Sequence, residues 1–312
     1  MFNCRSILKV LQVLKSIIVC LLEKLILSII PRRKKSFIGE TVLITGSANG
    51  IGRQIVLKFA PTAAILVLWD IDDEGNKETS KLAQQLGAKR VFTYHCDCSN
   101  KEEVYKQADK VREDVGDVTI LINNAGIAIG KKFLELSDAE FEKTMRVNFL
   151  SQVWTCKTFL PAMMTLNHGH LVTTDSTAAL MGFPRFSDYS ASKYAIMGMM
   201  EAIDWEVSRA GKDGIKTTIV CPYFVHTALA RGFESKCPLL LPVYEPDYVA
   251  STIMDAIQKD KFYVVMPPTL RFLGIKMLIP RKITLLLLSC LKIADSIDEA
   301  YGRKKKDEPS KL

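Results

Sequence analysis

The sequence predicts a doubly wound α/β fold with a parallel sheet, built as a single domain with apolar extensions at both ends. Short runs rich in Val, Ile and Leu alternate with segments of helical periodicity, which is the pattern of repeated βαβ units. The first of these runs enters a glycine-rich turn at residues 46–52, and a helix follows. No internal repeat or low-complexity segment interrupts the alternation along the 312 residues.

Positive charge is concentrated at the two ends of the chain. The formal net charge is +8, of which residues 1–35 carry +7 and residues 271–312 carry +5, so that residues 36–270 carry −4. A mildly acidic core argues against nucleic acid as a partner, whereas basic ends suit an anionic membrane surface. The eight cysteines are scattered without metal-site spacing. We therefore expect reduced thiols in a cytosol-facing protein and no metal.

Residues 7–30 are apolar but are interrupted by Lys9, Lys15, Glu23 and Lys24. A bilayer span needs about 20 largely uncharged residues, and no small-x-small cleavage site of a signal peptide is present. Polar side chains fall on one side of a helical wheel, which favours an amphipathic helix lying in the membrane interface. A tilted span with snorkelling lysines stays open.

A basic cluster follows this segment and defines its end. Pro31 terminates the helix, and residues 32–35 are Arg or Lys. Basic residues beside an apolar segment favour the cytosolic side of a membrane. We therefore interpret residues 1–36 as a membrane anchor with a basic flank.

The first strand and its turn predict a phosphate-binding cradle. Residues 41–45 are a short β-branched run, and a helix is expected over residues 53–59. Glycines between a strand and a helix let the backbone approach a pyrophosphate, and the helix N-terminus supplies amides. The turn contains Gly46, Ser47, Asn49, Gly50, Ile51 and Gly52.

The second strand, residues 65–69, ends at Asp70. An acid in this place can accept both ribose hydroxyls of an adenosine and would repel a 2′-phosphate, so NAD is preferred over NADP. The alternative is that Asp70 only caps the following turn. Asp97, just after a third strand at residues 91–95, could accept from an adenine amino group, and a helix is expected over residues 101–115.

The fourth strand, residues 118–122, is followed by Asn123, Asn124, Ala125 and Gly126. Small side chains at this place leave room for a flat ring. A helix is expected from about residue 141 to residue 166, and it carries Asn148 between apolar neighbours. Because an unpaired amide is costly in such surroundings, Asn148 should have specific partners.

A fifth strand beginning at Leu171 delivers Ser176, thirteen residues before Tyr189. Tyr189 and Lys193 are four residues apart in an expected long helix, so they share one face. A nearby ammonium favours the phenolate and lowers the tyrosine pKa, which suits proton transfer near neutral pH. Taken alone, the pair is weak evidence, because such a pair far more often is a half-buried tyrosine beside a solvated lysine; the other motifs of the chain reverse this.

The last third of the chain completes the sheet. A sixth strand at residues 216–220 is followed by Pro222 and Thr227, and a helix at 247–259 and a strand at 262–266 close the domain. The apolar residues 239–244 suggest a lid over a lipid-sized pocket. Residues 270–293 are apolar again, but their longest uncharged part is too short to span a bilayer. They suggest a second membrane contact or a helix packed over the pocket.

Together, these motifs resemble the short-chain dehydrogenase/reductase superfamily over residues 37–268, with residues 1–36 and 269–312 as extensions. The resemblance is to the membrane-associated branch of retinol dehydrogenases and 17β-hydroxysteroid dehydrogenases, and it implies a Rossmann sheet that binds NAD. It implies a catalytic tetrad of Asn148, Ser176, Tyr189 and Lys193. The implied cofactor-binding residues are Gly46, Ser47, Asn49, Gly50, Ile51, Gly52, Asp70, Asp97, Asn124, Ala125, Gly126, Tyr189, Lys193, Pro222 and Thr227.

The roles implied by the resemblance are those of an alcohol dehydrogenase. Tyr189 would take the alcohol proton, Ser176 would bind the carbonyl oxygen, Lys193 would lower the tyrosine pKa and hold a ribose, and Asn148 would anchor a water molecule. Two residues depart from the family pattern. Asp175 stands where Ser or Ala is usual, and Tyr223 stands where Gly is usual.

The expected function is NAD-dependent oxidation of a lipophilic alcohol, foremost all-trans-retinol to retinal. The alternatives are a 17β-hydroxysteroid or long-chain alcohol/aldehyde oxidoreductase, and a non-enzymatic lipid-surface protein on the same fold. The expected partners are a retinoid or steroid and a membrane surface, and a homo-oligomer stays open. We expect the endoplasmic reticulum membrane, lipid droplets or both, with the catalytic domain facing the cytosol.

Overall fold

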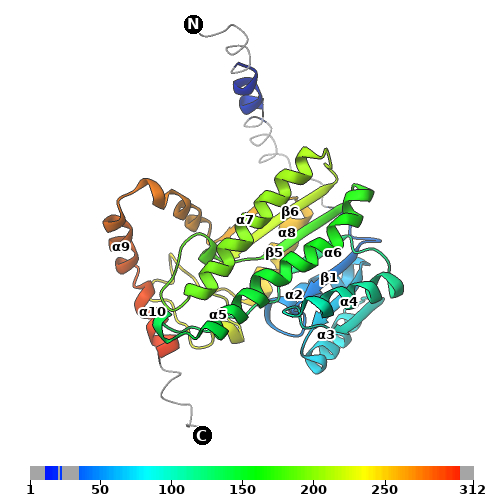
Figure 1. Cartoon of the computed structure of the whole chain (residues 1–312), viewed down its shortest axis with the longest axis horizontal. Helices are drawn as coiled ribbons and strands as arrows, with labels where there is room; N and C mark the ends of the chain where they lie inside the picture. Colours follow the sequence, from blue (N-terminus) through cyan, green and yellow to red (C-terminus); the bar gives the residue numbers. More distant parts are fainter. Residues whose placement is uncertain (1–10, 20–21, 23–34, 303–312) are drawn as a thin grey trace. The chain divides into compact units, whose positions relative to one another are not determined.

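Seven parallel strands form one sheet, in the order β3-β2-β1-β4-β5-β6-β7 (Figure 1). The computed structural model describes residues 11–19, 22 and 35–302, and the chain divides into two units, residues 1–35 and 36–312. The sheet, in the second unit, comprises β1 (Thr41–Thr45), β2 (Ile65–Asp70), β3 (Arg90–His95), β4 (Ile120–Asn123), β5 (Gly169–Thr174), β6 (Ile215–Pro222) and β7 (Tyr263–Met266). This arrangement confirms the predicted doubly wound sheet. Because β1 lies between β2 and β4, the strand order reverses there, and ligands of such sheets bind beside this point.

The central strands are buried on both faces. Every residue of β1, β4 and β5 is buried, as expected for parallel strands with helices on either side. The register is continuous across the switch point, since Val42 pairs with Leu66 on one side and with Ile120 on the other. The carboxyl ends of these strands therefore meet along one edge of the sheet.

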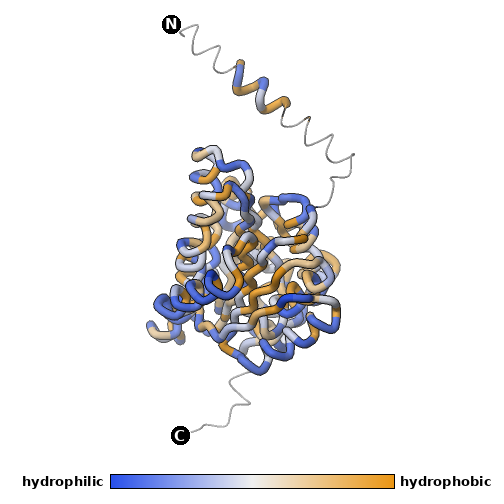
Figure 2. Tube along the Cα trace, turned by 90° about the vertical axis from the view of Figure 1, so that its right-hand side faces the viewer, coloured by the Kyte–Doolittle hydropathy of each residue, from blue (hydrophilic) through white to orange (hydrophobic). Residues whose placement is uncertain are grey.

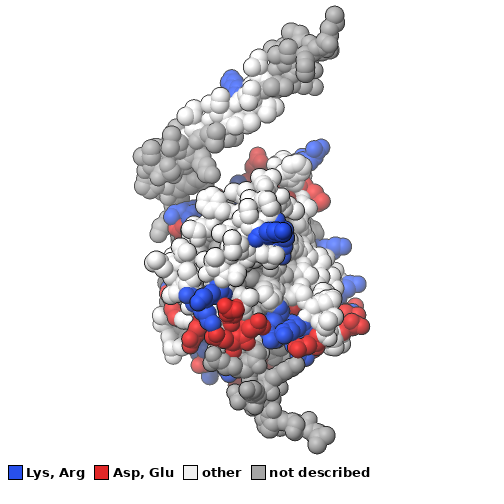
Figure 3. All heavy atoms as spheres, turned by 90° about the vertical axis from the view of Figure 1, so that its left-hand side faces the viewer, with Lys and Arg blue, Asp and Glu red and all other residues white. Residues whose placement is uncertain are grey.

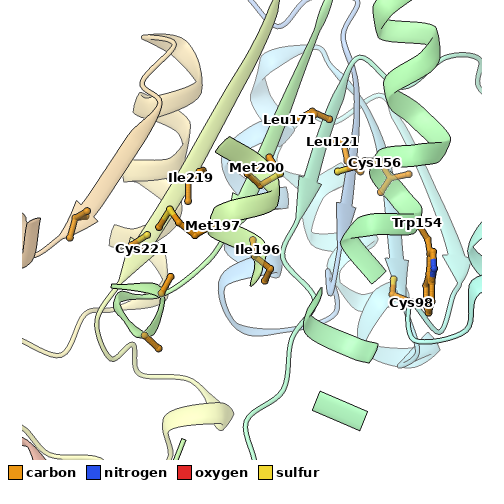
Figure 4. Packing of buried hydrophobic residues seen from close by; sticks show 14 of the residues in the cluster. Cys98, Leu121, Trp154, Cys156, Leu171, Ile196, Met197, Met200, Ile219 and Cys221 are labelled. Carbon is orange, nitrogen blue, oxygen red and sulfur yellow. The ribbon is translucent and has the colours of Figure 1, made fainter. Parts of the chain in front are cut away.

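Two helical layers cover the sheet. Residues of α2 (Gly50–Phe59), α3 (Asp73–Gln85) and α8 (Pro246–Gln258) share one buried apolar cluster with the strands. Residues of α4 (Lys101–Asp114), α6 (Ser151–Leu166) and α7 (Ser187–Arg209) share the other. In Figure 4 the α7 side chains Ile196, Met197 and Met200 lie against strand residues such as Leu171 and Ile219. Hydrophobic residues accordingly concentrate in the interior (Figure 2).

The helix predicted for residues 141–166 begins earlier and is interrupted. It starts as α5 (Asp138–Met145), where Ser137 and Glu140 form a capping box. A π-helical turn, Arg146–Leu150, then separates α5 from α6. Such turns insert one residue into the helix and are frequent at functional sites. Here the π turn carries Asn148.

Other elements lie close to their predicted positions, with two differences. Helix α3 was not predicted, because its first turns are polar and its apolar face is small; Asp72 caps it by accepting from the Gly75 amide at 3.0 Å. The tyrosine–lysine helix α7 is long as predicted. Strand β6 is longer than predicted and continues through Pro222.

The C-terminal part of the second unit is mostly helical. It contains the 3-10 segment η6 (Pro268–Leu278), α9 (Arg281–Cys290) and α10 (Ile293–Gly302). Ile293, Ile297 and Tyr301 of α10 are buried in the same apolar cluster as α7. In α9, by contrast, Leu285, Leu286 and Leu287 are exposed.

In the first unit, residues 11–19 and 22 are helical, within the amphipathic helix predicted for residues 7–30. Their apolar side chains are exposed, including Leu11, Val13, Ile17 and Leu22. The rest of that predicted helix lies outside the described residues, and so do residues 303–306, which are all Arg or Lys. Within the described part of the chain, no helix has both the length and the apolarity needed to cross a bilayer.

Candidate active site

Two cavities adjoin at the carboxyl edge of the sheet. One runs past the ends of β1, β2 and β4, and the other lies beside β5, β6 and α7. Both are lined by Ile51, Asn124, Gly126, Thr227 and Leu229, so they form one continuous site. We call them the dinucleotide cleft and the apolar cavity.

The glycine-rich turn closes tightly on the end of β4. A Cβ on Gly46 would lie 2.9 Å from the Ala125 Cα, and Gly46 has a φ of +68°. A Cβ on Gly52 would lie 1.9 Å from the Gly46 carbonyl oxygen. Side chains at these two positions are therefore excluded by packing, which lets the turn approach the end of β4 and the start of α2 closely.

Asn124 and Thr45 join the turn to β4. The Asn124 side-chain amide donates to the carbonyls of Thr45 and Gly46, both at 3.1 Å. In return, the Thr45 hydroxyl accepts from the backbone amides of Asn124 and Ala125 at 3.0 and 3.1 Å. These bonds hold small residues at the cleft wall, where the sequence predicted room for a flat ring.

Asp70 lies at the end of β2 and faces the dinucleotide cleft. Its carboxylate accepts from the Ala48 amide at 2.8 Å and from the Asp72 amide at 2.9 Å. A carboxylate offers about four acceptor sites, so two remain for a ligand. Asp97 also lines the cleft, and one of its oxygens accepts from the Ser99 amide at 2.8 Å.

Not every predicted cofactor residue faces the cleft. Ser47 is fully buried, and its hydroxyl donates to the Asn76 side chain at 2.8 Å and to the Trp69 carbonyl at 3.2 Å. Its side chain therefore fixes the turn against β2 and α3. Gly52 lies behind the turn and serves packing. The remaining predicted positions, from Asn49 and Gly50 to Pro222 and Thr227, line one of the two cavities.

Asn148 has specific partners, as predicted. Its side-chain oxygen accepts from the Ile127 amide at 2.8 Å, and its amide donates to the Ile127 carbonyl and to the Ser192 hydroxyl, both at 3.0 Å. The Ser192 hydroxyl in turn donates to the Tyr189 carbonyl at 2.7 Å. The π turn is thereby tied both to the loop after β4 and to the catalytic face of α7.

Ser176, Tyr189 and Lys193 meet in the apolar cavity. Ser176 follows β5, while Tyr189 and Lys193 lie one turn apart in α7, as the spacing predicted. The Lys193 ammonium donates to the Thr174 carbonyl at 2.9 Å and lies 5.4 Å from the centroid of the Tyr189 ring. Lys193 is only 3% exposed, so the solvated lysine of the alternative interpretation is wrong.

The tyrosine pKa does not follow the prediction that Lys193 would lower it. Burial raises the pKa of Tyr189 above its ordinary value, and a hydrogen bond from Ser176 opposes this only in part. Burial likewise lowers the pKa of Lys193. The reason is desolvation, which disfavours the charged form of both groups.

Aromatic side chains that the sequence did not single out as cavity residues form much of the apolar wall. Phe183, Phe186 and Phe224 line the cavity together with Tyr223. Phe224 stacks on Phe233 with centroids 3.5 Å apart. The aromatic residues between Ser176 and Tyr189 were the available signal for part of this wall.

The lid expected at residues 239–244 does not line the cavity. Leu239 is 93% exposed, whereas Leu241 points into the apolar core. Beside the cavity stands α10 instead, where Tyr301 packs edge-on against Phe186 at 5.0 Å and donates to the Leu229 carbonyl at 2.8 Å. An apolar run in the sequence could not indicate which of its residues would face inward.

A parallel sheet with a glycine cradle at its switch point, next to a half-buried tyrosine and a buried lysine, defines a dinucleotide-dependent oxidoreductase. Comparison with known proteins gives the same class, since the family model of the short chain dehydrogenases matches residues 40–238. The chain belongs to the short-chain dehydrogenase family.

Relatives match almost the whole chain. Epidermal retinol dehydrogenase 2 of Homo sapiens is 46% identical over 306 residues, which cover 98% of this chain and 99% of the relative. Estradiol 17-beta-dehydrogenase 11 of Macaca fascicularis is 40% identical, over 97% of this chain and 99% of the relative. A short chain dehydrogenase/reductase from Burkholderia phymatum, solved in complex with NAD, superposes with a TM-score of 0.70 at 27% identity. The superposition covers 81% of this chain and 96% of the Burkholderia phymatum chain.

Proposed function

We propose that the protein oxidises the hydroxyl group of a lipophilic alcohol with NAD, and that all-trans-retinol is its foremost substrate. The observation that carries the reaction is the meeting of Ser176, Tyr189 and Lys193 beside the junction of the dinucleotide cleft and the apolar cavity. The choice of a retinoid as the substrate rests on the relatives that are named retinol dehydrogenases.

The dinucleotide cleft fits NAD. The glycine-rich turn, packed closely at Gly46 and Gly52, would hold the pyrophosphate with backbone amides at the N-terminus of α2. Asp70, with two acceptor sites left, would hold the adenosine ribose and repel a 2′-phosphate. Asn124 and Thr227 line the passage to the apolar cavity, where the nicotinamide half would lie. When bound, NAD accepts the hydride from the alcohol carbon.

The chain's own groups handle the proton and the position of the oxygen. Tyr189 accepts the hydroxyl proton, and Ser176 hydrogen-bonds the oxygen as it becomes a carbonyl. Lys193 places a positive charge near the phenolate that forms, which makes proton transfer easier. Asn148 holds the π turn against Ser192, one residue from Lys193, and keeps this face of α7 in place.

The apolar cavity suits a long hydrocarbon with one hydroxyl group. Phe186 and Phe224 contribute flat apolar surfaces to its lining, and Ser176 and Tyr189 contribute hydroxyl groups. The same wall suits a steroid, and relatives named estradiol 17-beta-dehydrogenase 11 make a steroid alcohol the second candidate. Long-chain alcohols follow, because apolar pockets discriminate weakly.

Exposed apolar residues support a membrane-surface location. Phe272, Met277 and Leu278 of η6 and Leu285 and Leu286 of α9 are exposed in the second unit. Figure 3, which views the molecule from the side of α9, shows a broad surface of mostly uncharged residues, with a basic group near its middle and charged groups gathered along its lower part. Together with the exposed apolar helix at residues 11–19, this supports attachment to the cytosolic face of the endoplasmic reticulum or of lipid droplets.

The test is a cellular assay. Cells that express the full chain receive all-trans-retinol, and retinal and retinoic acid are measured against cells that express Tyr189→Phe, which keeps the ring but lacks the proton acceptor. We expect retinoid oxidation to fall at least tenfold in the variant. Membrane fractions supplied with NAD and a steroid alcohol form the second arm. Turnover of the steroid with no retinal above the control would replace retinol with a steroid.

A further inference from the structure

The residue before Ser176 brings a second carboxyl group into the apolar cavity. Asp175 follows β5, is 2% exposed and lines the cavity together with Ser176, Tyr189 and Lys193. Its backbone amide donates to the Val220 carbonyl of β6 at 2.7 Å, which fixes its position. Neither side-chain oxygen makes a well-aligned hydrogen bond within the described part of the chain. A buried carboxyl group that lacks such hydrogen bonds interacts strongly with any charge nearby.

The charge that faces Asp175 is the Lys193 ammonium, 4.0 Å from its Oδ1. The same ammonium lies 5.4 Å from the centroid of the Tyr189 ring. One buried cation therefore has two neighbours that can become anions. Because all three groups are largely shielded from water, the charge state of one affects the other two.

The groups that act electrostatically on one another here come from four elements: Asp175 at the end of β5, Tyr189 and Lys193 of α7, Cys221 of β6 and Tyr301 of α10. Burial raises the pKa of Asp175 to about 8, although Lys193 opposes this. Burial is the largest cause of the raised pKa of Tyr189, and a negative charge on Asp175 raises it further. Cys221 acts in the same direction as Asp175 on the tyrosine.

We propose that Asp175 is a positioning residue that competes with Tyr189 for the charge of Lys193 and thereby sets the pH range in which Tyr189 accepts a proton. The inference rests on the proposed function, in which Tyr189 is the base for alcohol oxidation. Only deprotonated Tyr189 can accept the proton, so oxidation rises with pH as this group ionises. Ionised Asp175 repels the phenolate and moves this rise to higher pH. Removal of the carboxylate moves it to lower pH.

The experiment measures the pH dependence of kcat/KM for alcohol oxidation in the full chain and in Asp175→Asn and Asp175→Ser. We expect the rising limb to move to lower pH by about one unit or more in both variants. The matched control is Asp188→Asn. Asp188 is also buried and adjoins Tyr189 in sequence, but its Oδ2 accepts from the Thr144 hydroxyl at 2.7 Å, and it does not line the cavity. In Asp188→Asn, the rising limb of the pH profile should lie at the same pH as in the wild-type protein.

A second measurement needs no substrate. Ultraviolet difference titration between each protein and its Tyr189→Phe counterpart records the ionisation of Tyr189 alone. It should occur at lower pH when residue 175 is Asn or Ser. A shifted titration without retinol turnover would contradict only the assigned substrate. An unchanged titration in both Asp175 variants, or an equal shift in Asp188→Asn, would overturn the role of Asp175. If the Asn variant does not fold, the smaller Ser variant decides.

Discussion

Asp70 combines a structural and a binding role in one carboxylate. It caps the Ala48 amide in the glycine-rich turn and also faces the cleft. Its replacement by Ala would therefore disturb the turn as well as the ligand. Asn keeps an acceptor oxygen for the Ala48 amide and removes the negative charge, but its NH2 group cannot accept from the Asp72 amide, so Asp70→Asn disturbs the turn less than Ala does without leaving it unchanged.

We predict that Asp70→Asn weakens NAD binding and improves the relative use of NADP. A hydrogen bond to a charged group is worth about 1.5–3 kcal/mol, so the Kd for NAD should rise roughly tenfold or more. The measurement is titration of both cofactors by the quenching of protein fluorescence. The comparison variant is Asp97→Asn, because Asp97 lines the same cleft but does not lie at the end of β2. Unchanged affinity for both cofactors in Asp70→Asn would remove Asp70 from the ribose site.

At the scale of residues, short-range spacing predicted proximity but not energetics. Four residues in a helix bring Tyr189 and Lys193 together, whatever the rest of the chain does. The direction of the tyrosine pKa depends on burial, and burial depends on β5, β6 and the aromatic wall. Ser47 shows the same limit, because the sequence gives its place in the turn but not the direction of its side chain.

At the scale of elements, strands and their ends were predictable because parallel strands read as continuous apolar runs. The π turn was not, since periodicity in this region is that of one continuous helix. Helix α10 was not predictable either, because its role depends on contacts with residues that are distant in the sequence. Tyr301 fits where it does because Gly130 leaves room for it; a Cβ on Gly130 would lie 2.3 Å from the tyrosine ring.

Helix α10 fastens the parts of the chain that surround the apolar cavity. Asp298 pairs with Arg185 of the loop before α7, and Glu299 pairs with Lys236 of the loop after β6. Tyr301 adds a ring contact to Phe186. We expect this helix to hold the aromatic wall in the arrangement that binds substrate.

We predict that Tyr301→Ala raises the KM for the lipophilic alcohol several-fold and lowers thermal stability, while the affinity for NAD is kept. Truncation of a buried aromatic ring costs about 3–5 kcal/mol in well-packed surroundings. Tyr301→Phe is the matched control, because it keeps the ring against Phe186 and loses only the bond to Leu229. A KM for Tyr301→Ala equal to that of Tyr301→Phe would show that the ring does not shape the cavity.

At the scale of the whole molecule, charge and apolar exposure are distributed unevenly. The region of residues 36–270 is mildly acidic, and both flanking segments are basic. Exposed apolar side chains occur in the helix at 11–19 and again in η6 and α9. Apolar burial and attraction to anionic lipids act together at a membrane surface, and two weak attachments bind more firmly than one.

The boundary of the first unit determines how this can be tested. Phe37 is 3% exposed and packs edge-on against Phe59 at 4.9 Å, and Glu40 accepts from His168 at 3.1 Å. A deletion that reached these residues would damage the core of the second unit. Removal of residues 1–35 leaves both contacts and the whole sheet in place.

We predict that deletion of residues 1–35 releases the protein from membranes in part, without loss of fold. The second unit keeps its own core and its exposed α9 leucines, so a fraction should stay bound. Leu285→Ser with Leu286→Ser in the shortened chain should release that remainder. The measurement is flotation with vesicles that contain anionic lipid, and circular dichroism checks the fold. As the control, the two serine substitutions in the full chain should release less than the deletion does. If the shortened chain floats as completely as the full chain, the main attachment lies in the second unit and not in residues 1–35.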